Sequence, residues 1–246
     1  MQNFKNSISH FELAKKKLVY FSNLNYPNLI CAVSSKQIGD LRTKDNKGLE
    51  NFCRVLEIEA NNVVKAEQIH GNVVKEVNKH DCAEIVEGVD GLLTKSKNIY
   101  LFVVVADCLP IVFFDPKQQM VGVVHAGWKG SSQNIAGGMV KNFAEIGSDP
   151  KDILVGIGPS ICQKHYEVGR EVAVLFEQGN IKEDNHKFYL DLRKINNSQL
   201  IESGINPNNI DNINFCTFEE KDAFYSWRRE KPNLSGEFGL IAGLKS

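Results

Sequence analysis

Three short apolar segments in the middle of the chain constrain its fold more than any other feature. They are IYLFVVVA (99–106), LPIVFFD (109–115) and MVGVVHAG (120–127), and all three are rich in β-branched residues. Turn-forming residues such as Asp115–Pro116 bound them, and each is too short for a buried helix. These segments are therefore predicted to be buried strands.

Helical and strand patterns alternate along the rest of the chain. The patterns predict helices over 131–146, 171–178 and 193–203, and further strands over 72–77, 153–160 and 213–218. Ser131 or Ser132 is expected to cap the first helix, and Gly147 suits its end. Strands mixed with helices favour a layered α/β or α+β domain. No repeat or linker divides the 246 residues, so a single domain over 1–246 is expected.

Composition excludes several classes of partner. The chain has 29 Lys and Arg against 30 Asp and Glu, so it lacks the basic field that holds nucleic acid or an anionic membrane. Its longest apolar run, 99–106, is too short to cross a bilayer. Six cysteines form no C-x-x-C pair and are expected to be reduced thiols. We therefore expect a cytoplasmic protein, a monomer or small homo-oligomer, that binds any anionic substrate through a local cluster.

Three segments place reactive side chains beside the ends of predicted strands. They are His70 in EQIHG, Cys108 in ADCLP and His125 in VVHAGWKG. Two imidazoles and a thiolate form a donor set that suits zinc, and three protein ligands leave a fourth position open, as in catalytic zinc sites. Asp107 interrupts two apolar strands, where a buried charge needs a partner. It is a candidate for orienting a ligand or shuttling a proton.

The same residues allow other interpretations. Cys108 could be a nucleophile with His70 or His125 as its base, without a metal. Copper also suits the donor set. A lone cysteine or histidine beside a buried strand is more often structural than functional, and the spacing of these three matches no compact zinc motif.

Two further segments could bind substrate. HAGWKG, which contains Lys129, leads into a predicted helix whose start could hold phosphate, although a structural turn is an equal alternative. FYSWRR (224–229) offers Tyr225 and Trp227 for stacking on a base, and Arg228 and Arg229 for holding an anion. An aromatic core segment with exposed arginines would give the same pattern.

Seven motifs give the chain a specific resemblance. They are QIHG (68–71), VDGLLT (89–94), ADCLPIVFFD (106–115), VGVVHAGWKG (121–130), GIGPSICQKHYEVG (156–169), FCTF (215–218) and FYSWRR. Their content and order resemble the YfiH family, also called the laccase-domain or multicopper polyphenol oxidase family. The resemblance covers about residues 60 to 230.

The resemblance implies a fold, a metal and an activity. The fold is an α+β, layered α-β-β-α sandwich with mixed sheets, similar to the catalytic domain of cytotoxic necrotising factor. Zinc is bound by His70, Cys108 and His125, with copper as the alternative. The implied protein is a purine nucleoside phosphorylase that acts on adenosine, inosine and methylthioadenosine and that also deaminates adenosine. The alternatives are a copper-dependent polyphenol oxidase and a Cys–His amidohydrolase that edits a peptidoglycan precursor.

Several positions depart from the family's pattern. Lys36 and Lys129 stand where arginine is expected, and lysine lacks the bidentate guanidinium fork. Glu237 stands where the family pattern has an arginine, which reverses the charge at that position. These changes weaken the case for phosphate while leaving the metal ligands intact. The remaining histidines, His10, His80, His165 and His186, are scattered, which speaks against several coppers. The candidate substrate-binding residues are Lys36, Lys129, Tyr225, Trp227, Arg228 and Arg229.

Overall fold

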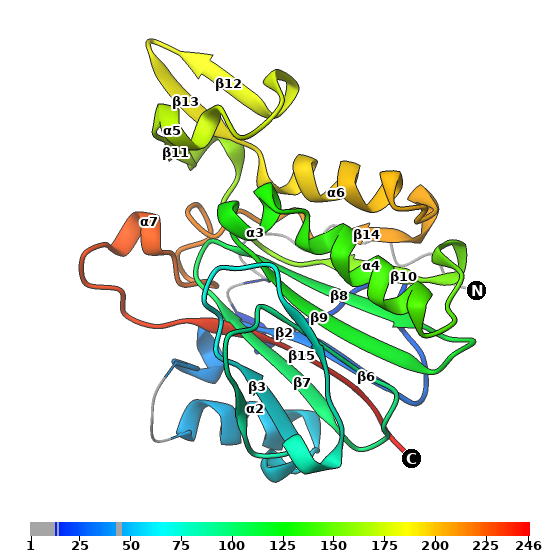
Figure 1. Ribbon diagram of the computed structural model, residues 1–246. Coiled ribbons are helices and arrows are strands. Elements are labelled where there is room, and N and C mark those ends of the chain that lie inside the picture. The colour runs from blue at the N-terminus through cyan, green and yellow to red at the C-terminus, as the bar shows by residue number, and fades with distance from the viewer. Residues whose placement is uncertain (1–12, 14, 43–45) are drawn as a thin grey trace.

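Two six-stranded sheets stack face to face in the computed structural model, with helices outside each (Figure 1). The structure describes Leu13, residues 15–42 and residues 46–246, so His10 lies outside the described residues. The layers are helix α2 (Lys47–Leu56), the first sheet, the second sheet, and then helices α3 (Trp128–Ser132), α4 (Ile135–Glu145) and α6 (Leu192–Glu202). The predicted α-β-β-α sandwich is confirmed. Its likeness to cytotoxic necrotising factor stays a prediction.

The first sheet carries a late strand at its centre. Its order is β1-β2-β15-β7-β3-β5, with β15 antiparallel to both neighbours and β3 parallel to β7. The strands are β1 (Leu18–Val19), β2 (Leu29–Ser34), β15 (Phe238–Leu244), β7 (Tyr100–Val105), β3 (Val63–Ala66) and β5 (Ile85–Val86).

The second sheet is built around the antiparallel pair of β8 and β9, which are in register from Leu109 opposite Ala126 to Asp115 opposite Met120. Its order is β14-β10-β8-β9-β6-β4. The strands are β14 (Ile210–Asn212), β10 (Leu154–Ile157), β8 (Leu109–Asp115), β9 (Met120–Ala126), β6 (Gly91–Thr94) and β4 (Val74–Glu76).

Alternation along the strands divides the core into layers. In β7, Leu101 and Val103 point between the sheets, whereas Tyr100 and Phe102 pack toward α2. Strand β9 likewise places alternate residues between the sheets and against α4 and α6. Side chains in a strand point to opposite faces in turn, so a strand covered on both sides reads as continuously apolar.

A small three-stranded sheet stands apart from the sandwich at the top of Figure 1. It contains β11 (Glu167–Val168), β13 (Lys187–Leu190) and β12 (Ile181–Asp184), with α5 (Arg170–Ala173) beside it. Its own apolar cluster contains Leu190 and Val172, and Trp128 of α3 packs against it. The last helix, α7 (Trp227–Glu230), precedes β15. Short 3₁₀ turns cover Lys36–Ile38, Ala60–Asn62, Lys79–Asp81, Pro150–Asp152, Gln163–His165, Gln178–Asn180 and Pro207–Asn209.

The predicted strands at 72–77, 99–106, 109–115, 120–127 and 153–160 are confirmed within a few residues, as is the helix at 193–203. The helix predicted over 131–146 is two helices. Asn134 adopts a left-handed backbone (φ 56°) between them, and its side chain accepts the Gly137 N–H to cap α4. The capping role given to Ser131 or Ser132 is therefore wrong, whereas Gly147, at φ 105°, ends that region as expected.

Two other element predictions are wrong. The helix over 171–178 is only the four-residue α5, which ends before Gln178. Residues 213–218 do not form a strand. Pairing with β10 stops at Asn212, and Cys216 makes only an isolated bridge to Ser160 before the chain turns.

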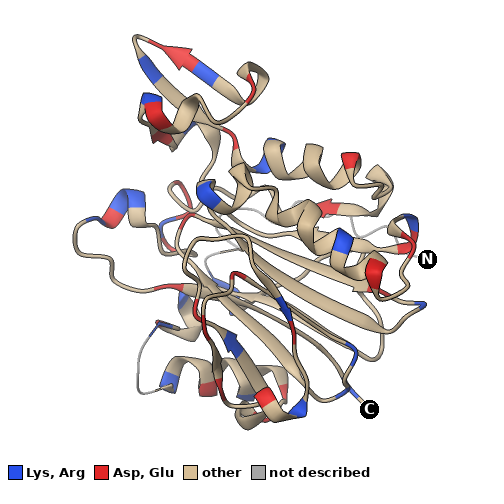
Figure 2. Ribbon diagram, viewed as in Figure 1, with Lys and Arg blue, Asp and Glu red and all other residues tan. Residues whose placement is uncertain are grey.

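Charged residues of both signs are interspersed along the helices and the small sheet (Figure 2), as the net charge of −1 suggests. None of the helices in the described part of the chain has the length and apolarity that a membrane-spanning segment needs.

Candidate metal centre

His70, Cys108 and His125 come together from three separate parts of the chain. His70 lies in the loop between β3 and β4, Cys108 in the short link from β7 to β8, and His125 near the end of β9. Their ligand atoms all lie within 4.8 Å of one another. The two imidazole rings meet edge to face, with centroids 4.7 Å apart. The three residues singled out from the sequence thus form one cluster.

Asp90 holds two of these residues in place. Its carboxylate is fully buried directly before β6, and its Oδ1 lies 2.7 Å from His125 Nδ1. It also accepts the backbone N–H groups of His70 (3.0 Å) and Gly71 (2.6 Å). These two backbone hydrogen bonds hold His70 in a left-handed conformation, at φ 60°. Burial raises the pKa of Asp90, but these hydrogen bonds outweigh it and lower the pKa overall.

The cluster favours separated charges at neutral pH. Burial raises the pKa of the Cys108 thiol, but the charges and hydrogen bonds of His125 and His70 bring it down to about 7. Burial opposes protonation of His125, yet Cys108 and Asp90 raise its pKa to about 10. Cys108 is therefore held near its thiolate form, which binds metals and acts as a nucleophile.

Gly127 leaves room beside the ligands. A Cβ atom at this position would lie 3.0 Å from Cys108 Sγ and 3.3 Å from His70 Cδ2. Any larger residue would therefore crowd the cluster from the turn that follows β9. The need for glycine at position 127 is explained by this close approach rather than by a special backbone angle.

The residues present fit a zinc ion. Asp90 binds Nδ1 of His125 and leaves Nε2 as the ring nitrogen for a metal, an arrangement common for metal-bound histidine. His125 is buried, Cys108 is partly buried and His70 is exposed, so solvent can reach one side. Two nitrogens and one thiolate with an accessible fourth side match catalytic zinc sites.

Asp107 contacts other groups than the predicted ligands. One of its carboxylate oxygens accepts the Thr217 hydroxyl and the other accepts the Arg228 backbone N–H, each at 2.6 Å. Its backbone has a strained φ of 101°. Asp107 thus ties the link between β7 and β8 to the segment that leads into α7. The carboxylate that hydrogen-bonds a candidate ligand, His125, is Asp90. The role predicted for Asp107, orienting a ligand or shuttling a proton, stays a prediction.

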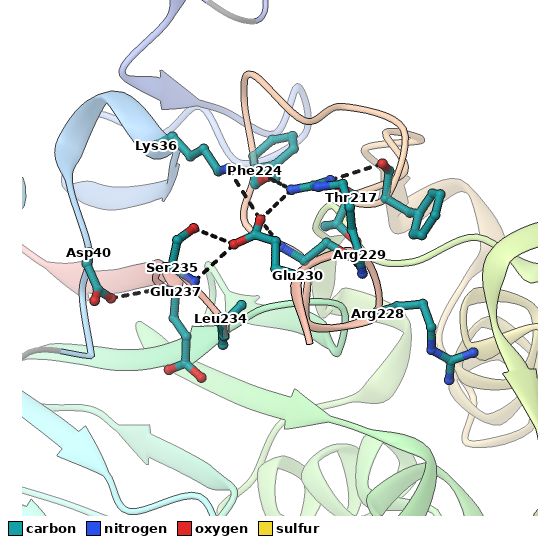
Figure 3. Close-up of polar contacts among 12 residues, drawn as sticks. Lys36, Asp40, Thr217, Phe224, Arg228, Arg229, Glu230, Leu234, Ser235 and Glu237 are labelled. Atoms are coloured by element: carbon teal, nitrogen blue, oxygen red, sulfur yellow. Dashed lines mark hydrogen bonds and ion pairs between the residues drawn. The ribbon is translucent and has the colours of Figure 1, made fainter. Parts of the chain in front are cut away.

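Two predicted substrate-binding cations are engaged inside the protein (Figure 3). The Arg229 guanidinium donates to the carbonyl oxygens of Thr217, Phe218 and Phe224 and to Glu230 Oε1. Lys36 Nζ lies 3.4 Å from the same Glu230 oxygen. The Glu230 carboxylate also accepts the backbone N–H and the hydroxyl of Ser235. Binding of substrate by Lys36 or Arg229 stays a prediction, and it would compete with these contacts.

The other predicted substrate residues have freer side chains. Arg228 points away from Arg229 in Figure 3, donates to the Glu167 carbonyl at 2.7 Å and lies 5.3 Å from the Tyr166 ring centre. Lys129 is exposed, 5.5 Å from the Trp128 ring centre. Trp227 is 50% exposed. Tyr225, in contrast, is buried, and Lys36 Nζ lies 4.7 Å from its ring centre.

Glu237 lies within electrostatic reach of the centre. Burial raises the pKa of its carboxyl group, while His125, His70 and Arg42 counter this and Asp40 adds to it. Figure 3 shows the carboxylate pointing away from the Glu230 network. A negative charge on this side disfavours an anionic substrate there.

Sequence reasoning missed two residues of this region. Asp90 stands in VDGLLT as an ordinary turn residue, and only the need to orient a metal-bound histidine could have singled it out. Tyr166 is half-buried, and burial followed by the negative charge of Cys108 raises the pKa of its phenol, which therefore lies near the centre. A surface hollow of about 410 Å³ lies elsewhere, along Glu167–Arg170 and the small sheet, and includes none of the predicted site residues.

The stacked sheets and the Cys–His–His cluster at their connection define an α-β-β-α sandwich protein with a candidate metal centre. Residues 22–245 match the family model described as multi-copper polyphenol oxidoreductase laccase. The chain therefore belongs to this family.

Relatives and solved structures agree with this assignment. The purine nucleoside phosphorylase YlmD of Bacillus subtilis is 34% identical over 81% of this chain and 77% of its own length. The adenosine deaminase RL5, from an unknown prokaryotic organism, is 36% identical over 58% of each chain. The crystal structure of YlmD from Geobacillus stearothermophilus superposes with a TM-score of 0.86 at 25% identity, covering 94% of this chain and 97% of that one.

Proposed function

We propose that this protein is a zinc-dependent enzyme acting on purine nucleosides, a phosphorylase with adenosine deaminase activity. The observation that carries the proposal is the cluster of His70, Cys108 and His125, with Asp90 on Nδ1 of His125. The names of relatives, purine nucleoside phosphorylase and adenosine deaminase, supply the substrate class. A single domain over 1–246, as a monomer or small homo-oligomer, belongs to the same proposal.

The chemistry follows from the donor set and its surroundings. Zinc held by His70, Cys108 and His125 would polarise a bound group and lower the pKa of bound water. Asp90 fixes the orientation of His125 and keeps a proton on Nδ1. Tyr166, stacked under the Arg228 guanidinium near Cys108, offers a ring beside which a purine can pack.

The cationic side chains near the centre determine which residues are available to bind phosphate. Arg229 and Lys36 are already paired with Glu230 and backbone carbonyls. We therefore propose that Lys129 and Arg228 are the residues that hold phosphate. Glu237 adds a carboxylate near the histidines, which weakens phosphate binding. Water that attacks the anomeric carbon in place of phosphate would release free base and ribose. Deamination adds water at C6 of the purine and releases ammonia, so it needs no phosphate and is expected to persist where phosphorolysis is weak.

The test measures the products formed from adenosine and inosine with and without phosphate. Phosphorolysis yields ribose 1-phosphate and free base, deamination converts adenosine to inosine, and hydrolysis releases base without phosphate. Cys108→Ala is expected to abolish turnover and to lower the zinc content, whereas Cys82→Ala, a cysteine outside the centre, retains both. Turnover of these nucleosides by Cys108→Ala would contradict the mechanism.

One alternative has its own support. The Cys108 thiol, with its lowered pKa beside His125, also suits a metal-free amidohydrolase acting on a peptidoglycan precursor. Such an enzyme would survive chelation and be inactivated by thiol alkylation. A copper-dependent polyphenol oxidase, the activity in the family's description, would instead need copper and consume oxygen with a phenol.

A further inference from the structure

A second group of ligating side chains lies away from His70, Cys108 and His125, in two turns of the chain. Cys162 and His165 belong to the turn that follows β10, and Glu219 belongs to the turn after β14. Their sulfur, ring-nitrogen and carboxylate-oxygen atoms all lie within 4.8 Å of one another. His165 Nε2 is 2.8 Å from Glu219 Oε1. One cation placed among them could reach all three.

Backbone contacts hold these two turns together. Ser160 and Cys216 form a bridge in which Ser160 N–H donates to the Phe215 carbonyl and Thr217 N–H donates to the Ser160 carbonyl. The His165 ring stacks on Phe218 at 4.3 Å between centroids and an interplanar angle of 18°. The ligand side chains are thus positioned by the fold itself, which reduces the entropy lost when a metal binds.

Cys216 lies beside Cys162, next to the group of three. Its side chain is buried, and Sγ accepts the backbone N–H of Cys162 at 3.3 Å across a separation of 54 residues. The backbone N–H groups of Phe218 and Glu219 also hydrogen-bond this sulfur, and the Cys162 thiol contacts it. Amide donors gathered around a sulfur favour its negative form, which is the form that binds metals.

We propose that Cys162, His165 and Glu219 form a second zinc site. One sulfur, one imidazole nitrogen and one carboxylate oxygen suit zinc, whereas magnesium and calcium prefer oxygen alone. The zinc would link the two turns, with the sulfur of Cys216 beside Cys162. Thr217, within the second turn, binds Asp107, so the site would also steady the link between β7 and β8.

An ordinary surface ion pair accounts for only part of this arrangement. Lys164 Nζ also approaches Glu219 Oε1, at 3.3 Å, so Glu219 has two cationic neighbours without any metal. Such a pair gives no reason for two cysteine sulfurs to adjoin it, one of them ringed by amide donors.

The test is zinc stoichiometry of the full chain, made metal-free and reduced, then titrated with Zn²⁺ against a chromophoric chelator. Wild type is expected to bind two equivalents, and Cys162→Ser and Cys108→Ser one each. The double variant is expected to bind none, whereas Cys82→Ser retains both. His165→Ala, a change in a turn that does not alter the cysteines, is expected to lose the same equivalent as Cys162→Ser.

Cobalt identifies the ligands independently of stability. Co²⁺ added to Cys108→Ser should give sulfur-to-metal charge-transfer absorption, which the further change Cys162→Ser removes. Equal zinc content in Cys108→Ser and the double variant, two equivalents in Cys162→Ser, or a Cys162–Cys216 disulfide in place of zinc binding after reduction would overturn the proposal. Nucleoside turnover plays no part in these readouts, so the inference stands or falls apart from the proposed function.

Discussion

The centre of His70, Cys108 and His125 and the basic segment around Arg229 both assemble reactive side chains, but they use them differently. In the centre, Asp90 hydrogen-bonds the far ring nitrogen of His125 and leaves its other nitrogen free to face Cys108. Around Arg229, every hydrogen bond described for the guanidinium is to a backbone carbonyl or to Glu230 (Figure 3). In the centre, a buried carboxylate orients the histidine whose other nitrogen faces Cys108. Around Arg229, the charged group itself is used to hold neighbouring segments of the chain together.

This difference teaches that a cation in a motif need not bind substrate. Arg229 and Arg228 are neighbours in sequence, yet only Arg228 points away from the Glu230 network. A partly buried guanidinium that satisfies several carbonyl groups is costly to redirect, because those carbonyls would lose their partners. Substrate contacts are therefore expected from Arg228 and Lys129.

The largest expected effect comes from removing the support of the centre. Asp90→Asn should weaken zinc binding by about 10–100-fold, because the orienting carboxylate is replaced by a neutral amide. The measurement is chelator competition in a Cys162→Ser background, so that a single centre is titrated. The matched control is Asp115→Asn, a buried carboxylate that accepts the N–H groups of Lys117 and Gln118 far from the ligands. Equal affinities in the two variants would refute the role of Asp90.

Next in size is the structural use of Arg229. Arg229→Ala should lower the free energy of unfolding by about 2 kcal/mol, because charged hydrogen bonds are lost and buried carbonyls are left unpaired. Arg228→Ala should change stability by about 1 kcal/mol or less and instead raise the KM for phosphate. Urea unfolding and phosphorolysis kinetics measure the two effects. The reverse pattern would erase the distinction between the arginines.

Crowding the centre should have a smaller effect. Gly127→Ala places a Cβ 3.0 Å from Cys108 Sγ, so the sulfur must shift by a few tenths of an ångström. We expect about tenfold weaker zinc binding, within the usual range for overpacking. Gly138→Ala is the control, since nothing lies within 4 Å of its Cβ and alanine favours the helix there. An undiminished affinity in Gly127→Ala would mean that the ligands do not need this space.

The last expected effect appears only in acid, as a pH dependence of stability from Glu230. Burial raises its pKa, but hydrogen bonds from Ser235 and Arg229 and the charge of Lys36 lower it from 4.5 to about 2. Because the folded pKa is the lower one, the stabilisation is complete above about pH 4.5 and is lost as pH falls toward 2. Thermal unfolding of Glu230→Gln should show a shallower decline across this window than wild type. Parallel curves would place the acid sensitivity elsewhere.

Periodicity predicted the parts of the fold that are governed by apolar pattern alone. Residues 99–106, 109–115 and 120–127 are covered on both faces, so their composition is unmistakable. The break at Asn134 was hidden because the apolar spacing continues through it, and only the left-handed backbone and its cap divide the helix. INFCTF has the β-favouring residues of a strand, but only Ile213 bonds a strand, through its N–H to the Ile157 carbonyl. The contacts of Phe215 and Thr217 are to Ser160, in a turn.

The sequence indicates which residues belong to the candidate site, but it does not indicate how those residues are arranged in space. His70, Cys108 and His125 were chosen from strand ends and from a family resemblance, and the structure brings them together. Asp90 and the cluster of Cys162 and Glu219 depend on contacts between distant segments, which no local pattern contains. His165 looked unpaired in the sequence, yet its nitrogen lies 2.8 Å from a carboxylate oxygen contributed from 54 residues further along.

Strand β15 has a consequence for how this protein is made. It lies between β2 and β7, with Leu240 opposite both Val33 and Val103, so these two strands cannot join one sheet until it arrives. On the ribosome, β2 and β7 emerge long before β15 and must wait with unpaired edges. Pairing across some 200 residues also makes closure of the sheet slow. Strand β7, which the link carrying Cys108 leaves, gains its second neighbour only at that step.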